Sequence, residues 1–143
     1  MRNVRHLLEV KGSEVYSIGP DAPVVDAIRL MAEKGIGALV VLREGQLAGV
    51  VSERDYARKI VLQGRSSSST RVDEIMTGNV VQVGLDDTVD HCMQLVTDRR
   101  LRHLPVVDAS GRVVGVVSIG DLVKAVIEVQ QEELDQLQRY IAG

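Results

Sequence analysis

The two halves of this chain carry the same sequence pattern. The segment Gly49-Val-Val-Ser-Glu-Arg-Asp55 recurs 66 residues later as Gly115-Val-Val-Ser-Ile-Gly-Asp121. Upstream, residues 27–36 match residues 92–101 at an offset of 65, and the offset changes where the second copy carries one extra residue in the turn at 108–112. Because turns accept insertions readily, we interpret the chain as a duplicated structural unit, and any fold assignment must accommodate that duplication.

Each copy predicts the element order β-α-β-β-α. Apolar residues of the first helix recur at helical spacing, as Val24, Ala27 and Met31 do in the first copy. The strands that follow are apolar and are joined by turns rich in Gly and charge, which is typical of hairpins. The expected ranges in the first and second copy are 14–18 and 79–83 for the first strand, 23–35 and 88–100 for the helix, 38–42 and 104–107 for the second strand, and 47–51 and 113–117 for the third, with a second helix beginning at Ser52 and at Ser118.

A unit of about 60 residues is marginally stable alone. We therefore expect an α/β (α+β) protein in which two pseudo-symmetric repeats pack through their sheets and share a core. The polar, low-complexity segment after the first repeat reads as a linker, and Leu134, Leu137 and Ile141 lie near helical spacing among Gln and Glu. The predicted parts are a first repeat at 10–63, a Ser-rich linker at 64–71, a second repeat at 72–127 and a C-terminal amphipathic helix at 128–143.

Composition excludes several classes of protein. A net charge of −3 over 143 residues argues against a broad basic face for nucleic acid, which needs clustered Lys and Arg against phosphates. The single cysteine, Cys92, excludes an internal disulfide and a zinc site built from several cysteines. No apolar run approaches the ~18 residues of a membrane span, and the first residues contain no secretory segment. We expect a cytoplasmic protein with neither a nucleic acid nor a membrane as partner.

The residues offer little for catalysis. There is no Walker A motif, and Gly35-Ile-Gly37 is not followed by the glycine of a dinucleotide fingerprint. The histidines at 6, 91 and 103 lack metal-ligand spacing, and no nucleophile–base pair is evident. We expect no enzyme, no catalytic cofactor and no metal. Since the chain has no Trp and no Phe, a flat ligand would rest mostly on aliphatic side chains.

The repeated Ser-x-x-Asp admits two interpretations. It is typical of a capping box, in which the Ser hydroxyl accepts the third amide of the helix and the carboxylate reaches back. The Asp is also suited to hold the vicinal hydroxyls of a ribose, because a carboxylate at a helix start can accept two hydrogen bonds. The glycine that precedes each copy, Gly49 or Gly115, would let a ligand approach the backbone closely.

These patterns resemble a tandem CBS-domain pair, the Bateman module. The resemblance rests on the two Gly-Val-Val-Ser-x-x-Asp segments, on Ile36-Gly-Ala-Leu-Val-Val and Arg102-His-Leu-Pro-Val-Val before the hairpins, and on Glu74-Ile-Met-Thr77. It covers about residues 10–127. The resemblance implies two three-stranded sheets packed together, with a cleft for up to two adenine nucleotides or related ligands such as AMP, ADP, ATP, NAD or S-adenosylmethionine.

The resemblance also implies two binding sites, in which the Asp holds the ribose, aliphatic side chains enclose the adenine and basic residues meet the phosphates. The site with Asp121 would comprise Lys11, Gly12, Tyr16, Ile36, Gly37, Ala38, Arg102, His103, Ser118 and Asp121. The site with Asp55 would comprise Ser52, Arg54, Asp55, Arg58, Met76, Thr77, Val81, Leu101, Arg102 and His103. Because Arg102 and His103 replace Gly37 and Ala38 of the first copy, the two sites are expected to be unequal.

Two functions are compatible with these observations. The first is a regulatory, signal-transducing module that binds an adenine nucleotide, works as a homodimer and acts on a separate, unidentified protein. The alternative is a structural dimerisation or adaptor protein whose nucleotide sites are vestigial. Binding of adenine compounds would distinguish the first from the second.

Overall fold

The computed structural model describes residues 2–142. Its elements in chain order are α1 (Val4–Lys11), β1 (Ser17–Ile18), α2 (Val24–Lys34), β2 (Ala38–Arg43), β3 (Gln46–Ser52), α3 (Glu53–Tyr56), the π-helical turn η1 (Ala57–Val61), the 3-10 turn η2 (Val72–Glu74), β4 (Val83–Gly84), α4 (Val89–Arg99), β5 (His103–Val107), β6 (Val113–Ser118) and α5 (Ile119–Ala142).

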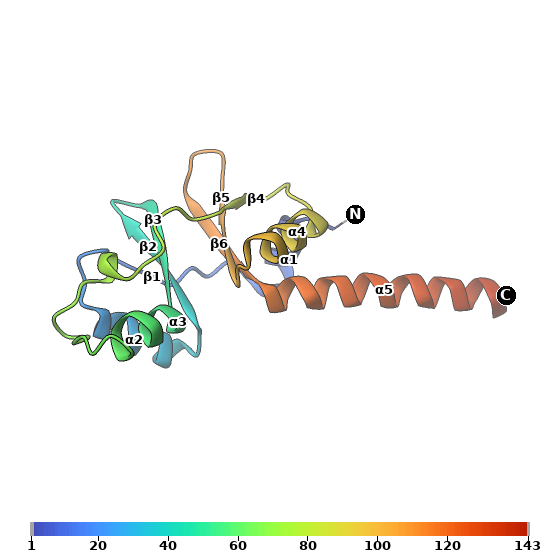
Figure 1. Ribbon diagram of the computed structural model, residues 1–143. Helices are drawn as coiled ribbons and strands as arrows, with labels where there is room; N and C mark the ends of the chain where they lie inside the picture. The colour runs from blue at the N-terminus through green and yellow to red at the C-terminus, as the bar shows by residue number, and fades with distance from the viewer. Residues whose placement is uncertain (1, 143) are drawn as a thin grey trace.

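Each repeat forms its own three-stranded sheet. The orders are β1-β2-β3 and β4-β5-β6, with the first pair parallel and the hairpin antiparallel in both. The two sheets lie next to each other in the middle of the molecule, with α2 and α3 on one outer side and α1, α4 and α5 on the other (Figure 1). The predicted element order, the hairpins and the pairing of two sheets are thus confirmed.

The first strand of each repeat is much shorter than expected. Pairing is limited to Ser17 and Ile18 in the first sheet and to Val83 and Gly84 in the second, whereas the sequence predicted strands over 14–18 and 79–83. The residues before each short strand run between the two halves of the molecule. Only the carbonyl of Tyr16 bonds to the sheet that follows it, accepting the amide of Val40 at 3.3 Å, and Thr77 pairs instead with Val50 of the other sheet.

The segment at the start of each repeat packs into the core of the other repeat, and the sequence did not predict this. The apolar face of α1, with Val4, Leu7 and Leu8, is buried in the core of the second repeat. Reciprocally, Val72 and Ile75 at η2 are buried in the core of the first repeat. The expectation of one shared core is therefore wrong. There are two separate cores, and each includes apolar residues from the segment at the start of the other repeat.

The glycine that precedes Val-Val-Ser in each repeat has a packing explanation. A Cβ at Gly49 would lie 2.5 Å from the backbone oxygen of Thr77 and 2.7 Å from the sulfur of Met76, and a Cβ at Gly115 would lie 2.8 Å from the methyl groups of Leu8. The sequence suggested that these glycines admit a ligand. That expectation is corrected by the structure, because the groups that approach the glycines belong to the protein itself, namely Met76 and Thr77 at Gly49 and Leu8 of α1 at Gly115.

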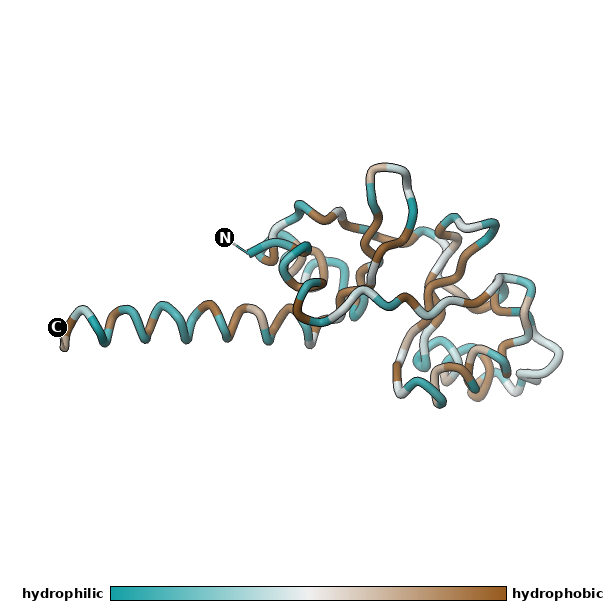
Figure 2. Tube along the Cα trace, turned by 180° about the vertical axis from the view of Figure 1, so that it is seen from behind, coloured by the Kyte–Doolittle hydropathy of each residue, from teal (hydrophilic) through white to brown (hydrophobic). Residues whose placement is uncertain are grey.

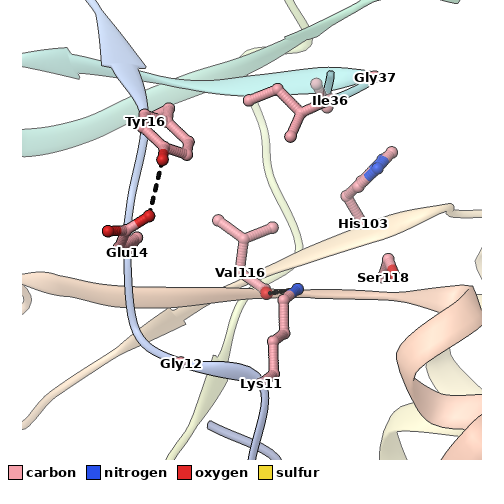
Figure 3. A pocket seen from close by; sticks show the side chains of 10 residues that line it. Lys11, Gly12, Glu14, Tyr16, Ile36, Gly37, His103, Val116 and Ser118 are labelled. Atoms are coloured by element: carbon pink, nitrogen blue, oxygen red, sulfur yellow. Dashed lines mark hydrogen bonds between the residues drawn. The ribbon is translucent and has the colours of Figure 1, made fainter. Parts of the chain in front are cut away.

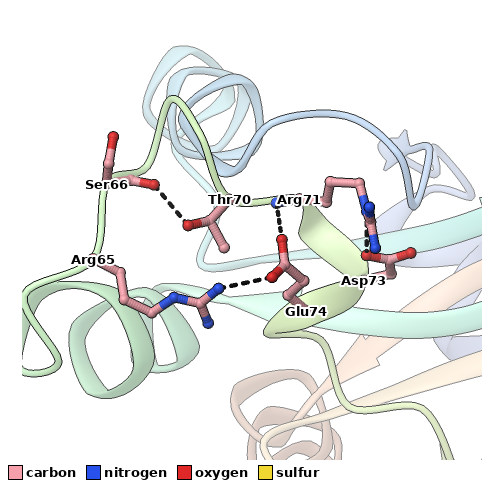
Figure 4. A network of polar contacts seen from close by, with 6 residues as sticks. All are labelled: Arg65, Ser66, Thr70, Arg71, Asp73 and Glu74. Atoms are coloured by element: carbon pink, nitrogen blue, oxygen red, sulfur yellow. Dashed lines mark hydrogen bonds and ion pairs between the residues drawn. The ribbon is translucent and has the colours of Figure 1, made fainter.

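The linker is ordered by polar contacts. Thr70 is buried and donates from its hydroxyl to the carbonyl of Ser66 at 2.7 Å. Arg65 and the amide of Arg71 both bind the carboxylate of Glu74, at 2.8 and 2.7 Å (Figure 4). The Ser-rich sequence therefore forms a defined turn that seats η2 against the first repeat.

The last helix is continuous from the second repeat to the end of the described chain. Leu122 and Ala125 of α5 are buried in the second core, and the helix then projects far from the body (Figure 1). Apolar and polar residues alternate along the projecting part (Figure 2). Between residues 2 and 142, no helix combines the length and apolarity that crossing a bilayer requires.

Candidate ligand-binding site

A cavity of about 640 Å³ lies between the two repeats. It is lined by residues from both halves, namely Lys11, Gly12, Glu14, Tyr16, Ile36, Gly37, Ala38, His103, Val116 and Ser118 (Figure 3). One wall is the crossing segment, which we define as residues 12–16 between α1 and β1, together with Lys11. A second wall is the start of β2, and the third is formed by β5 and β6. The walls are mixed, with aliphatic side chains and a few polar groups, which is the composition expected of a small-molecule site.

Lys11 links this cavity to Asp121. Its ammonium donates to Oδ2 of Asp121 and to the carbonyl of Val116, both at 2.5 Å. The same carboxylate oxygen accepts the amide of Ser118 at 2.8 Å. Burial raises the pKa of Asp121. The hydrogen bonds from Lys11 and Ser118 and the positive charge of Lys11 together outweigh this effect, so that the pKa lies below its ordinary value of 3.8. The carboxylate is therefore ionised at neutral pH and already has a cation beside it.

Two residues of the wall were missed by sequence reasoning. Glu14 lies in the crossing segment, and its Oε2 accepts the hydroxyl of Tyr16 at 2.7 Å (Figure 3). Val116 lies on β6 and corresponds to Val50 of the first copy, which lines the second cavity described below. The repeat alignment could have identified Val116 by that correspondence, whereas nothing in the sequence signals Glu14.

His103 is a neutral group at pH 7. Burial lowers its pKa below the ordinary value of 6.5, and the positive charges of Lys11 and Arg102 lower it further, against a smaller opposite effect of Asp121. The imidazole thus offers one donor and one acceptor to the cavity rather than a positive charge.

A smaller cavity of about 150 Å³ lies at the first copy of the motif. Its lining is Val50, Arg54, Asp55, Thr77, Asn79, Val80, Val81, Arg100, Leu101, Arg102 and His103. Arg100 ends α4 in the left-handed conformation with φ of 54°, where the first repeat has Gly35 with φ of 66°. An arginine in that conformation is strained by its Cβ. It adds a third guanidinium to a cavity that also holds Arg54 and Arg102.

Both copies of Ser-x-x-Asp cap a helix. Ser52 accepts the amide of Asp55 at 3.2 Å, and Oδ2 of Asp55 accepts the amide of Ser52 at 2.9 Å. Ser118 and Asp121 repeat this arrangement at 3.1 and 2.8 Å. The capping interpretation is confirmed. It leaves open a second role, because one carboxylate oxygen is enough for the cap.

The family model described as CBS domain matches residues 4–62 and 72–128. The chain belongs to the CBS-domain family. The two matched segments correspond to the two repeats whose interface holds the cavities.

Known CBS-domain proteins share most of this chain. The mitochondrial CBS domain-containing protein CBSX3 of Arabidopsis thaliana is 48% identical over 128 residues, which cover 86% of this chain and 62% of the relative. The crystal structure of the CBS-domain protein NE2398 has a TM-score of 0.84 and 48% identity and covers 89% of this chain and 99% of that one. The CBS domain pair of MJ0100, in complex with 5′-methylthioadenosine and S-adenosyl-L-methionine, has a TM-score of 0.79 and 25% identity, covering 88% and 96%. The chain thus spans about three fifths of its Arabidopsis relative.

The CBS pair brings together most of the residues singled out from the sequence. Of the ten residues expected with Asp121, eight line the larger cavity. The two exceptions are Arg102, which lines the smaller cavity, and Asp121. Asp121 lines an adjoining groove of about 260 Å³ between α1 and α5, which shares Lys11 with the cavity. Of the set expected with Asp55, three residues do not line the smaller cavity, namely Ser52, Arg58 and Met76. Ser52 serves the cap, and Met76 packs against Gly49.

Proposed function

We propose that this CBS pair is a regulatory module that binds an adenosine-containing ligand in the larger cavity. The observation that carries the proposal is the cavity itself, because its walls come from both repeats and enclose a volume suited to a nucleoside. The binding of methylthioadenosine and S-adenosylmethionine by the related pair of MJ0100 supports it. AMP, ADP, ATP and NAD remain candidates with the same base and sugar.

Each wall has a role in this proposal. Ile36 and Val116, which face each other in Figure 3, would hold the purine between aliphatic surfaces. Asp121 and Ser118 would hold the ribose hydroxyls. Since Oδ2 of Asp121 accepts both Lys11 and the Ser118 amide, the ribose would bind the other carboxylate oxygen or displace the ammonium of Lys11.

The smaller cavity is proposed as a second site for a phosphate-bearing ligand. Arg54, Arg100 and Arg102 provide charge-assisted donors around a space large enough for a phosphate group. Asp55 would hold a sugar there, and its second oxygen already lies 3.3 Å from the ammonium of Lys59. Thr77, Val81 and Leu101 would contact the base.

The regulatory effect follows from differential affinity. A ligand that contacts both repeats stabilises the arrangement in which both walls are in place, and only that difference shifts an equilibrium. The proposal assigns binding rather than catalysis to the chain, and the response would pass to a separate protein through α1 and α5, which pack together beside the cavity.

The test is a titration followed by NMR. The amides of Gly12 and Gly37 report on the larger cavity, and those of Asn79 and Val81 report on the smaller one. Asp121→Asn should weaken the binding of adenosine compounds at the larger cavity, as reported by the Gly12 and Gly37 amides, roughly ten-fold, because a hydrogen bond to a charged group is lost. Asp55→Asn is the matched control. If no adenine compound moves either pair of amides, the proposal is wrong.

The adaptor function remains the second candidate, and α5 favours it. Leu134, Leu137 and Ile141 are 54%, 59% and 78% exposed on the projecting part of this helix. We propose that a homodimer forms through this helix, since an isolated helical segment of this length is marginal in water. An adaptor without ligand binding would dimerise and show no response to any adenine compound.

The cytoplasm is our proposed compartment. The Arabidopsis relative is named as mitochondrial, so the matching experiment is a fluorescent fusion of the full chain in its own cells. Accumulation of the fusion in an organelle would overturn this assignment.

A further inference from the structure

We propose that Glu14 makes the larger cavity select adenosine ligands with an uncharged, cationic or singly phosphorylated 5′ substituent over the corresponding di- and triphosphates. The inference rests on the proposed function and specifies the ligand class for the same site. Glu14 lies in the cavity wall, yet no motif of the repeats includes it. Its selectivity follows from the charges that face the same space.

Glu14 brings a negative charge to the cavity that no cation neutralises directly. Within residues 2–142, no Lys, Arg or His nitrogen lies within ion-pair distance of its carboxylate, which instead accepts the Tyr16 hydroxyl at 2.7 Å. That hydrogen bond and the charge of Glu14 raise the pKa of Tyr16, as expected beside an ionised carboxylate. Lys34 does not line the cavity, and its ammonium lies 5.3 Å from the centre of the Tyr16 ring.

The other polar groups of the cavity do not compensate this charge. Lys11 is the only Lys or Arg in the lining, and its ammonium is already bound to Asp121 at 2.5 Å. His103 is neutral at pH 7 for the reasons given above. Since the charges of Lys11 and Asp121 offset each other, the charged side chains of the lining leave the net negative charge of Glu14, which repels each phosphate added to a ligand.

The smaller cavity has the opposite character. Three arginines line it, and its one carboxylate, Asp55, lies 3.3 Å from the ammonium of Lys59. The same chain thus holds a net positive pocket and a net negative pocket on the two sides of His103. Polyphosphates should accordingly prefer the smaller cavity, and nucleosides or sulfonium compounds the larger one.

The experiment compares ligands that differ only in charge. Adenosine, AMP, ADP and ATP are titrated into the full chain at low and high salt, and the affinity at the larger cavity is read from the amides of Gly12 and Gly37. In the wild type, affinity should fall roughly five-fold or more from AMP to ATP at low salt, and less at high salt, because Glu14 is exposed and salt screens its charge. Glu14→Gln should remove most of this gradient. Glu33→Gln, which removes the same charge from the exposed face of α2, should leave the gradient unchanged.

The outcomes separate this inference from the function on which it rests. The selectivity is refuted if ATP binds the larger cavity as tightly as adenosine, or if Glu14→Gln keeps the wild-type gradient, while adenosine binding itself persists. Failure of every adenosine compound to move the Gly12 and Gly37 amides, in wild type and variants alike, refutes the proposed function as well. If the fall in affinity from AMP to ATP is present in the wild type and in Glu33→Gln but absent in Glu14→Gln, both the selectivity and the proposed function are supported.

Discussion

The ammonium of Lys11 lies 2.5 Å from Oδ2 of Asp121, although the two residues are 110 positions apart in the sequence. Lys11 ends α1, and Asp121 lies in the first turn of α5. Arg2, at the other end of α1, pairs with Glu128 and Glu132 of α5. The first helix is therefore held at both ends on the last one, and one of these contacts is at the edge of the candidate site.

Lys11→Gln should raise the pKa of Asp121, because burial would then act with less opposition. The pKa of Asp121 is lowered in the folded chain, so the stability it contributes is present above about pH 4 and is lost as the pH falls through its folded value. Both side chains are partly exposed, so the variant should lose at most about 1 kcal/mol near neutral pH and nothing in strong acid. Carboxyl NMR titration and urea unfolding measure the two effects. Lys34→Gln is the control, and an unchanged Asp121 pKa would contradict the prediction.

Gly49→Ala should destabilise the fold by about 1–3 kcal/mol, as overpacking does. The added Cβ meets the backbone oxygen of Thr77 at 2.5 Å, and that oxygen accepts the amide of Val50. Gly115→Ala should cost less, because the methyl groups of Leu8 that it meets can rotate away. Circular dichroism during urea unfolding gives the free energies. Gly19→Ala, where nothing lies within 4 Å, should be nearly neutral, and equal losses for Gly19 and Gly49 would show that Thr77 does not pack against Gly49 as described.

Arg100→Gly separates backbone strain from ligand binding. The φ of 54° at Arg100 disfavours any residue with a Cβ, so Arg100→Gly should be more stable than Arg100→Ala by roughly 0.5–1 kcal/mol. Both variants should weaken phosphate compounds at the smaller cavity to the same extent, since both remove the guanidinium. Thermal unfolding and the Asn79 amide shift measure the two quantities. Greater stability of the alanine variant would contradict the strain.

The stability of the fold should rise as the pH increases toward and through 6.5, because of His103. Its pKa is lowered on folding by burial first and then by Lys11 and Arg102. As the pH falls through 6.5, the unfolded chain therefore takes up the proton first, and the folded state loses stability until its own lower pKa is reached. His103→Gln should flatten this part of the profile. His91→Gln is the control, and an unaltered slope in His103→Gln would assign the effect to another group.

Replacing Leu134 and Leu137 with Glu should dissociate the proposed homodimer. These side chains are 54% and 59% exposed in the single chain, so the substitutions remove an apolar contact surface without opening a core. Sedimentation at several concentrations should show a monomer, while the unfolding temperature of the dilute protein stays nearly constant. The control is Gln131→Glu with Gln138→Glu. A wild-type chain that is monomeric at all concentrations would rule out this interface.

Local pattern alone accounts for the repeat, the hairpins and the helix starts. Alternation of apolar residues, turn chemistry and the Ser-x-x-Asp cap act over a few residues, and the duplication shows each of them twice. The helix predicted at 23–35 was found at Val24–Lys34 for this reason. Most of the cavity wall was also identified, because the resemblance places the ends of the repeats together.

The tertiary structure decided which half each connecting segment serves. The short helix α1 is stabilised by the burial of Val4, Leu7 and Leu8 in the second repeat, and no local signal encodes a partner in the other half of the chain. The same crossing brings Lys11 and Glu14 to the cavity and places Leu8 against Gly115, while Met76 and Thr77 fill the space at Gly49. Arg102, which the sequence placed in both sites, lines only the smaller cavity of the two. Charge in a site depends on which side chains converge in space, and this convergence is a property of the packed chain rather than of any segment of its sequence.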